Sequence, residues 1–125
     1  MMESIFVDID QDYDRFFESK TWTHIKENLR MIFDSRKMNY GLRDIYIRKS
    51  SRGHVHLRFD FNSKMSFPDH FVFRSLMHDD PWRLSIDLRR YWTQGERGIN
   101  RLFDTKIKDD DTFQSGNWTV LSDVK

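Results

Sequence analysis

Apolar and polar residues alternate along three short stretches of the chain. These stretches are residues 4–10, 44–49 and 54–61. Alternation at every second position is typical of a β-strand with one buried face, because successive side chains point to opposite sides of a sheet. The second and third stretches are separated only by residues 50–53, a Ser, Arg and Gly-containing segment. The pattern therefore predicts three strands, the last two joined as a hairpin.

Two other stretches have apolar residues at every third or fourth position, which is the period of an amphipathic helix. The longer is residues 12–38, for which we expect a helix with a break near residues 21–23. The shorter is residues 69–78. An Asp-Pro pair follows at residues 80–81. Asp is a favoured N-cap and Pro a favoured first helical residue, so a further helix is expected to start there and run to about residue 92.

A last strand is predicted over residues 99–107, followed by a polar tail, residues 108–125, in which residues 117–124 can add an edge strand. The order is then β-α-β-β-α-β, which is the ferredoxin-like or RRM-like α+β arrangement. It predicts one domain, residues 1–107, with an antiparallel sheet and helices on one face. The usual strand order of this fold places the first and third strands side by side in the centre.

Composition narrows the class of protein. The chain has 125 residues, of which 38% are hydrophobic, with 11 Phe, and this suits a single core. The absence of Cys excludes disulfides, thiolate zinc sites and cysteine nucleophiles. A net charge of +1 names no partner. Since we see neither a secretory leader nor an apolar run of membrane length, we expect a cytoplasmic protein that does not bind a membrane.

The strand periodicity brings polar side chains onto the sheet face opposite the helices. Asp8 and Asp10 share that face of the first strand, and His54 and His56 share it on the third. Carboxylates beside imidazoles suit a divalent ion, Mg²⁺ or Mn²⁺ through the carboxylates or Zn²⁺ through the histidines. The alternative is that this is only the wet side of a one-sided sheet. Asp is disfavoured inside strands, which favours a site.

Basic residues are the candidates for binding phosphate groups. RNA-binding members of this fold carry stacking aromatics on the open face. Here Asp, His and Arg hold most of those positions, which favours phosphate or metal chemistry, although Phe6 and Tyr46 can still stack. The candidate phosphate-binding residues are Arg48, Lys49, Arg52, Arg58 and Arg101.

The motifs resemble those of the archaeo-eukaryotic primase superfamily, which includes the primase-polymerases of plasmids and viruses. Residues 5–10 (IFVDID) match its hydrophobic run into Asp-x-Asp, and residues 50–55 (SSRGHV) match its Ser- and Gly-containing hairpin ending in His. Its hydrophobic-Asp motif is matched by either Ile86-Asp87 or Phe103-Asp104. The resemblance implies that Asp8, Asp10 and a third Asp hold divalent metals, that His54 contacts nucleotide phosphates, and that basic residues guide the template.

A second resemblance uses the same hairpin. Residues 54–56 (HVH) are similar to the His-hydrophobic-His motif of HUH endonucleases, which start rolling-circle replication. In that family both histidines bind the metal and a tyrosine on a later helix attacks DNA. The resemblance implies these roles for His54, His56 and Tyr91.

Three hypotheses follow from these patterns. The first is a metal-dependent nucleotidyl transferase, or a catalytically reduced relative, that serves the DNA replication of a virus or plasmid. Its catalytic residues would be Asp8, Asp10 and His54, with His56 and Asp104 as further metal ligands. The second is an HUH-type nuclease. The third is a non-catalytic RRM-like module that binds nucleic acid, or forms a homodimer through its open sheet face.

Overall fold

The computed structural model describes residues 3–35, 39–95 and 117–121. The predicted strand 99–107, with Arg101 and Asp104, lies outside the described residues. Within the described residues, three α-helices, one short 3₁₀ helix and four strands follow one another. They are β1 (Glu3–Ile9), η1 (Tyr13–Glu18), α1 (Lys20–Ser35), β2 (Leu42–Lys49), β3 (Val55–Phe61), α2 (Phe67–Leu76), α3 (Pro81–Gln94) and β4 (Thr119–Val120).

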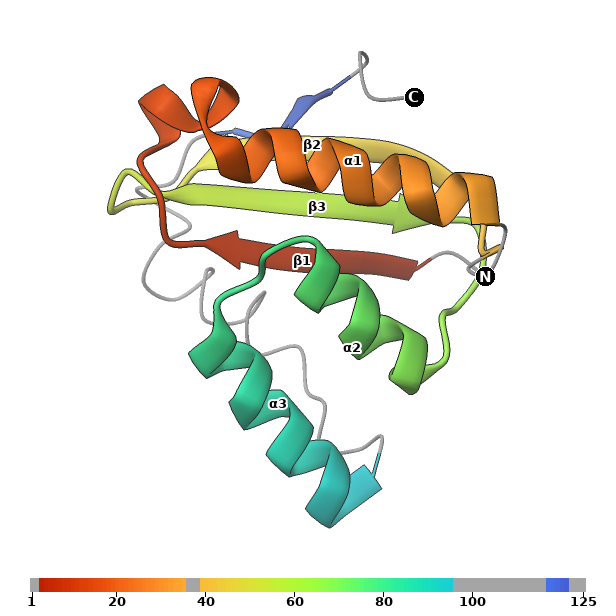
Figure 1. The fold of residues 1–125 in the computed structure, drawn as a ribbon. Coiled ribbons are helices and arrows are strands. Elements are labelled where there is room, and N and C mark those ends of the chain that lie inside the picture. Colours follow the sequence, from red (N-terminus) through yellow and green to blue (C-terminus); the bar gives the residue numbers. More distant parts are fainter. Residues whose placement is uncertain (1–2, 36–38, 96–116, 122–125) are drawn as a thin grey trace.

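The described strands form one antiparallel sheet in the order β1-β3-β2-β4. This confirms the predicted α+β class, with an antiparallel sheet and helices, and it confirms that the first and third strands are neighbours. The strand order differs from the expected one, because β1 lies at one end of the described sheet and β3 takes the more central place (Figure 1). Thr119 and Val120, in the tail segment expected to supply an edge strand, pair with β2.

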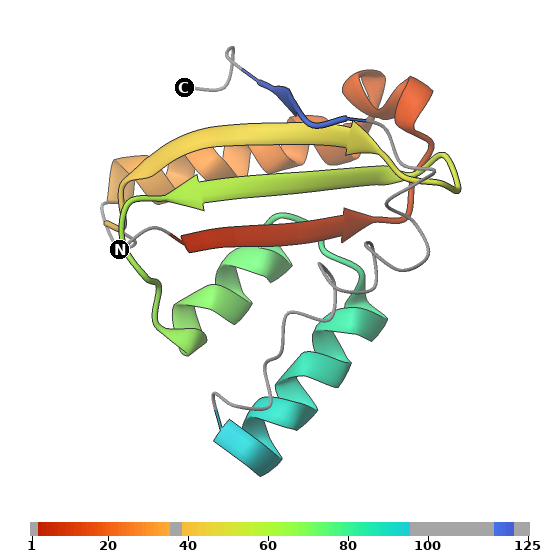
Figure 2. The same cartoon turned by 180° about the vertical axis from the view of Figure 1, so that it is seen from behind.

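Helices α1 and α2 lie against one face of the sheet, and α3 extends away from the β1 edge (Figure 1). The core fills the space between the sheet and these helices. It consists of the apolar positions of the alternating strands together with one side of α1 and the end of α2. Its largest fully buried side chains include Phe16, Phe59 and Phe73. Figure 2 shows the opposite face, over which none of the described helices lies.

The predicted helix 12–38 is interrupted at Ser19, somewhat before the expected break. The Ser19 hydroxyl donates to the Phe16 carbonyl at 2.6 Å and accepts from the Trp22 backbone N–H at 3.1 Å. It therefore ends η1 and caps the start of α1, which is the usual role of a serine at a helix N-terminus. The kink lets Phe16 and Trp22 both enter the core, with ring centroids 5.4 Å apart.

The start of α3 follows the prediction from the Asp-Pro pair. The Asp80 carboxylate accepts from the backbone N–H of Trp82 at 3.0 Å, and Pro81 is the first residue of the helix. This cap fixes where the chain turns between α2 and α3. The turn contacts β1 through the backbone of Asp8.

Candidate functional site

The turn between α2 and α3 covers the edge of β1 that faces away from β3. The Asp8 backbone N–H donates to Asp79 Oδ1 at 2.8 Å, and the Asp8 carbonyl accepts from the Asp80 N–H, also at 2.8 Å. Two residues before Asp8, on the same edge of β1, the Phe6 carbonyl accepts a hydrogen bond from Arg83 Nη2 at 3.0 Å. These contacts satisfy backbone groups that an uncovered edge strand would leave open to pairing with another chain. They also fix the position of Asp8.

Two carboxylate–imidazole contacts lie side by side on the face opposite the helices. Asp8 is paired with His56 in the β1–β3 register, and Asp8 Oδ1 lies 3.7 Å from His56 Nε2. Asp10, directly after β1, places Oδ1 3.1 Å from Nδ1 of His54, directly before β3. The structure thus brings together the four residues that the alternation selected. The cluster persists although β1 is at the end of the described sheet, because both contacts are made across to β3.

The imidazole of the inner contact is buried, unlike a side chain on the wet side of a one-sided sheet, which was the alternative interpretation. His56 is 3% exposed and Arg48 is 7% exposed. Arg48 Nε donates to His56 Nδ1 at 3.1 Å. Since a nitrogen that accepts a hydrogen bond carries no proton, the neutral His56 ring bears its hydrogen on Nε2, which faces Asp8. In this arrangement His56 orients Asp8 and does not offer Nε2 as a metal ligand.

Burial raises the pKa of Asp8 to about 6, and the neighbouring carboxylates of Asp79 and Asp80 add to the rise. The charges of Arg83 and His54 act in the opposite direction. The Asp8 side chain is still 31% exposed, and that of Asp10 is 81% exposed. A carboxylate that is costly to ionise yet reachable from solvent is a place where a cation is favoured, because the cation compensates the negative charge.

A network of ion pairs connects the α2–α3 turn to helices α2 and α3. The Asp79 side chain is fully buried, and its Oδ2 accepts from Arg74 Nε at 2.7 Å and from Arg83 Nη2 at 3.3 Å. Arg74 Nη1 also donates to Asp87 at 2.8 Å. Asp87, one of the two matches to the third primase-like motif, is therefore engaged by an arginine of α2. Sequence reasoning did not single out Asp79 or Arg74.

The candidate phosphate-binding residues have different surroundings. The guanidinium of Arg58 lies 4.0 Å from the Tyr46 ring and pairs with Asp60 at 3.2 Å. That of Arg48 lies 4.3 Å from the Trp118 ring. Trp118 thus lies on the sheet face where Tyr46 was expected to be open for stacking.

The other two described candidates are at the hairpin. Lys49 is about half exposed and lies 3.6 Å from Asp14. Arg52 is exposed in the turn between β2 and β3. These two residues are therefore reachable from solvent at the same end of the sheet as Asp10 and His54. Arg101 lies outside the described residues.

Tyr91, the candidate nucleophile of the HUH-like reading, packs in a different part of the molecule. Its ring centroid is 5.4 Å from that of Phe67 and 5.5 Å from that of Phe71, both in α2. Phe67 begins α2, and α2 follows the end of β3 opposite to His54. The described arrangement does not bring Tyr91 to the two histidines.

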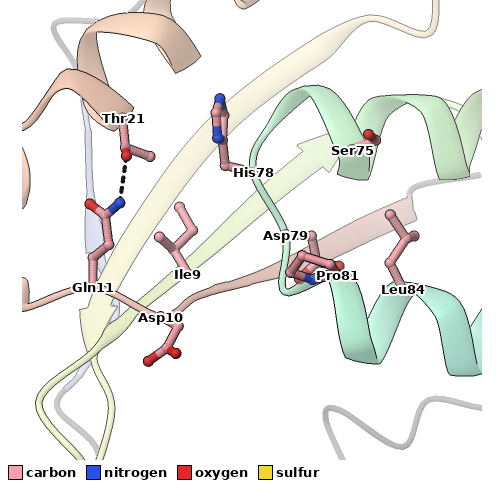
Figure 3. A pocket seen from close by; sticks show the side chains of 9 residues that line it. All are labelled: Ile9, Asp10, Gln11, Thr21, Ser75, His78, Asp79, Pro81 and Leu84. Atoms are coloured by element: carbon pink, nitrogen blue, oxygen red, sulfur yellow. Dashed lines mark hydrogen bonds between the residues drawn. The ribbon is translucent and has the colours of Figure 1, made fainter.

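A cavity of about 300 Å³ lies at the end of β1, between α1 and the α2–α3 turn (Figure 3). Asp10 belongs to its wall, so the cavity adjoins the carboxylate–imidazole cluster. Across it, Gln11 Nε2 donates to Thr21 Oγ1 at 2.5 Å. The lining residues are Ile9, Asp10, Gln11, Thr21, Ser75, His78, Asp79, Pro81 and Leu84.

Among the residues that the structure describes, no group of three or more His, Asp and Glu side chains is arranged to hold a metal ion. In the same parts of the chain, no helix has the length and apolarity needed to cross a bilayer. Comparison with protein-family models, with curated proteins and with solved structures found no match for this chain. The two family resemblances therefore rest on the motifs alone.

Proposed function

We propose that this protein acts on a nucleotide or on nucleic acid through a Mg²⁺ or Mn²⁺ ion held by Asp8 and Asp10, as a compact nucleotidyl transferase core or a catalytically reduced form of one. The observation that carries the proposal is the pair of carboxylate–imidazole contacts on one sheet face, with the pKa of Asp8 raised to about 6. The cytoplasmic location and the viral or plasmid origin belong to this proposal.

The donor set fits such an ion in a specific way. Mg²⁺ keeps several water ligands and is commonly bound by one or two carboxylates together with the phosphates of a substrate. Asp8 on β1 and Asp10 directly after it provide two carboxylates, with side chains that are 31% and 81% exposed. Among the described residues, no group of three or more His, Asp and Glu side chains is arranged to complete such a site. The ion is therefore expected to bind well only when a phosphate completes its coordination.

The surrounding residues have distinct roles in this proposal. Arg48 and His56 hold the Asp8 carboxylate in place from the buried side. His54, which is partly exposed beside Asp10, contacts a phosphate oxygen. Lys49 and Arg52, on the same end of the hairpin, add positive charge along the path of a phosphodiester chain. The bound ion supplies charge neutralisation for phosphoryl transfer.

Binding of a fluorescent deoxynucleoside triphosphate tests the proposal. We expect binding in the presence of Mn²⁺, loss of binding when EDTA removes the metal, and loss in the variant Asp8→Asn/Asp10→Asn. Asp34→Asn is a matched control, because Asp34 is an exposed aspartate on α1 away from the cluster. Equal affinity with EDTA, or unchanged affinity in the double variant, would contradict the proposal.

A further inference from the structure

Two histidines far apart in the sequence meet next to the cavity. His24 lies on α1 and His78 lies in the turn between α2 and α3. Nδ1 of His24 is 2.6 Å from Nε2 of His78, and the rings are inclined by 75° with centroids 4.8 Å apart. The two atoms that face one another are ring nitrogens, and a ring nitrogen of histidine is a common metal ligand. This contact is separate from the cluster at Asp8 and Asp10.

The backbone holds His78 in this position. Its φ angle is +63°, in the left-handed region that residues other than glycine seldom adopt. The turn is closed by hydrogen bonds from the His78 N–H to the Ser75 carbonyl at 3.1 Å and from the Asp79 N–H to the Arg74 carbonyl at 3.0 Å. Local strain of this kind persists only where the surrounding structure enforces it. The backbone that carries the His78 side chain is therefore held in one conformation.

The cavity gives room for further ligands. His78 is part of its wall, and so are Thr21, Gln11 and Asp10 (Figure 3). Thr21 is three residues before His24 and so lies on the same side of α1. His24 is exposed, so its ring can turn without disturbing the core. The contact thus has one fixed imidazole, one adjustable imidazole and a polar space beside them that can contain water.

We propose that His24 Nδ1 and His78 Nε2 form a binding site for a transition-metal ion of the Zn²⁺ class, with water in the cavity completing the coordination. Zinc–nitrogen bonds of about 2.0 to 2.1 Å in a tetrahedral arrangement separate two nitrogens by roughly 3.3 Å. The rings therefore have to part by less than about 1 Å from their present distance. The exposed His24 ring can make that movement.

Protonation of the pair is compatible with metal binding. Of the two facing nitrogens, one donates its hydrogen to the other in the metal-free protein. A shift of that hydrogen to the far nitrogen of the same ring frees both lone pairs without any change in charge. Burial, together with the charge of His24, holds the pKa of His78 below its ordinary value, so this ring is neutral near pH 7. An imidazole ligates a metal in its neutral form, so metal affinity is expected to fall in acid.

This site is independent of the proposed function, because it uses nitrogen ligands from α1 and the α2–α3 turn. Calorimetric titration of the full chain with Zn²⁺ tests it, with His24→Ala and His78→Asn as the variants. Alanine is a good helix former, and asparagine tolerates a positive φ angle. Loss of even an outer partner of a metal site usually costs about ten-fold or more in affinity, so each variant should lose at least that much.

Two controls separate this site from the carboxylate cluster. His54→Gln removes a histidine outside the pair, and Asp8→Asn removes a carboxylate of the cluster that does not line the cavity. Both variants should keep the zinc affinity of the wild-type protein. Nitrogen-15 NMR of the histidine rings should show zinc shifting His24 Nδ1 and His78 Nε2. The proposal is overturned if His24→Ala and His78→Asn bind Zn²⁺ as the wild type does, or if His54→Gln is the variant that loses it.

Discussion

The Asp79 carboxylate accepts a hydrogen bond from the Asp8 backbone N–H at 2.8 Å, so a side chain from the α2–α3 turn takes the place of a neighbouring strand. Asp79 thus connects the ion pairs that it makes with Arg74 and Arg83 to the strand that carries Asp8. The Asp79 side chain is fully buried, and two arginines bind its other oxygen. The position of the candidate site therefore depends on a residue that never reaches the site surface.

Replacement of Asp79 by Asn should be strongly destabilising. Asn keeps the shape of the side chain but removes the buried negative charge beside Arg74, which is 2% exposed and keeps only Asp87 as an ion-pair partner. Breaking a buried ion pair by removing one partner typically costs about 3 to 5 kcal/mol. Urea unfolding measures this difference in the free energy of unfolding. Asp34→Asn, at an exposed position, should change it by less than about 0.5 kcal/mol, and a similarly small effect of Asp79→Asn would contradict the account.

The contribution of Asp8 to the stability of the metal-free protein should become less favourable as pH rises from about 4 to about 6. The pKa of Asp8 is raised from 3.8 to about 6 in the folded state, so in this window the native protein binds more protons than the unfolded chain. This contribution therefore falls with increasing pH. His70 contributes in the opposite direction over the same range, because burial lowers its pKa from 6.5 to about 4. Because the Asp8 side chain is 31% exposed, we expect a loss of about 1 to 2 kcal/mol from Asp8 and not the full value that the shift implies.

Asp8→Asn isolates this effect. Asn is neutral at every pH, so the variant should be more stable than the wild type at pH 7 and should lose that advantage near pH 4. Unfolding curves at the two pH values, recorded in EDTA, provide the comparison. If the variant is less stable than the wild type at pH 7, the account in which burial and the neighbouring carboxylates raise the pKa of Asp8 is contradicted.

Much of the candidate cluster could be predicted from the sequence, because alternation assigns faces without any knowledge of the fold. Asp8 and His56 were placed together on that basis, and the register pairs them directly. Asp79 could not be found in the same way. Its role depends on how a helix turn meets a strand 71 residues earlier, and no periodicity reports such a contact. The meeting of His24 with His78 has the same origin, since it depends on how α1 and the α2–α3 turn pack.

The burial of Arg48 and His56 on this sheet face could not be predicted from the sequence either. Polar residues at Arg48 and His56 predict a solvated surface, whereas the two residues bind each other and are buried. Trp118 contributes to this difference through its contact with Arg48. Trp118 belongs to the polar C-terminal tail, and the sequence of that tail does not indicate that it contacts Arg48.

The His56 ring should be found in a single tautomer, with its hydrogen on Nε2. Arg48 Nε donates to His56 Nδ1, which leaves the other nitrogen to carry the proton. Nitrogen-15 NMR of the histidine rings distinguishes the two tautomers directly. Arg48→Gln should weaken this preference and shift the His56 signals, whereas the His54 signals should move less. A wild-type ring with its hydrogen on Nδ1 would be inconsistent with the proposed support of Asp8.

Trp118→Ala should destabilise the protein by about 2 kcal/mol, because the ring contacts the guanidinium groups of Arg48 at 4.3 Å and Arg58 at 5.2 Å. Trp92→Ala is the matched control, since Trp92 is 88% exposed on α3 and its loss should change stability by less than about 0.5 kcal/mol. Chemical denaturation of both variants makes the comparison. Equal effects would show that Trp118 does not hold the sheet face.

The most direct test of the central claim is paramagnetic broadening of the protein's amide NMR signals by Mn²⁺ in the presence of a deoxynucleoside triphosphate. If the ion is held by Asp8 and Asp10, their signals and that of His54 should broaden first, and those of Asp34 and Trp92 should persist. The effect should disappear in Asp8→Asn/Asp10→Asn. Broadening that is centred elsewhere, or that is the same in the double variant, would contradict the account.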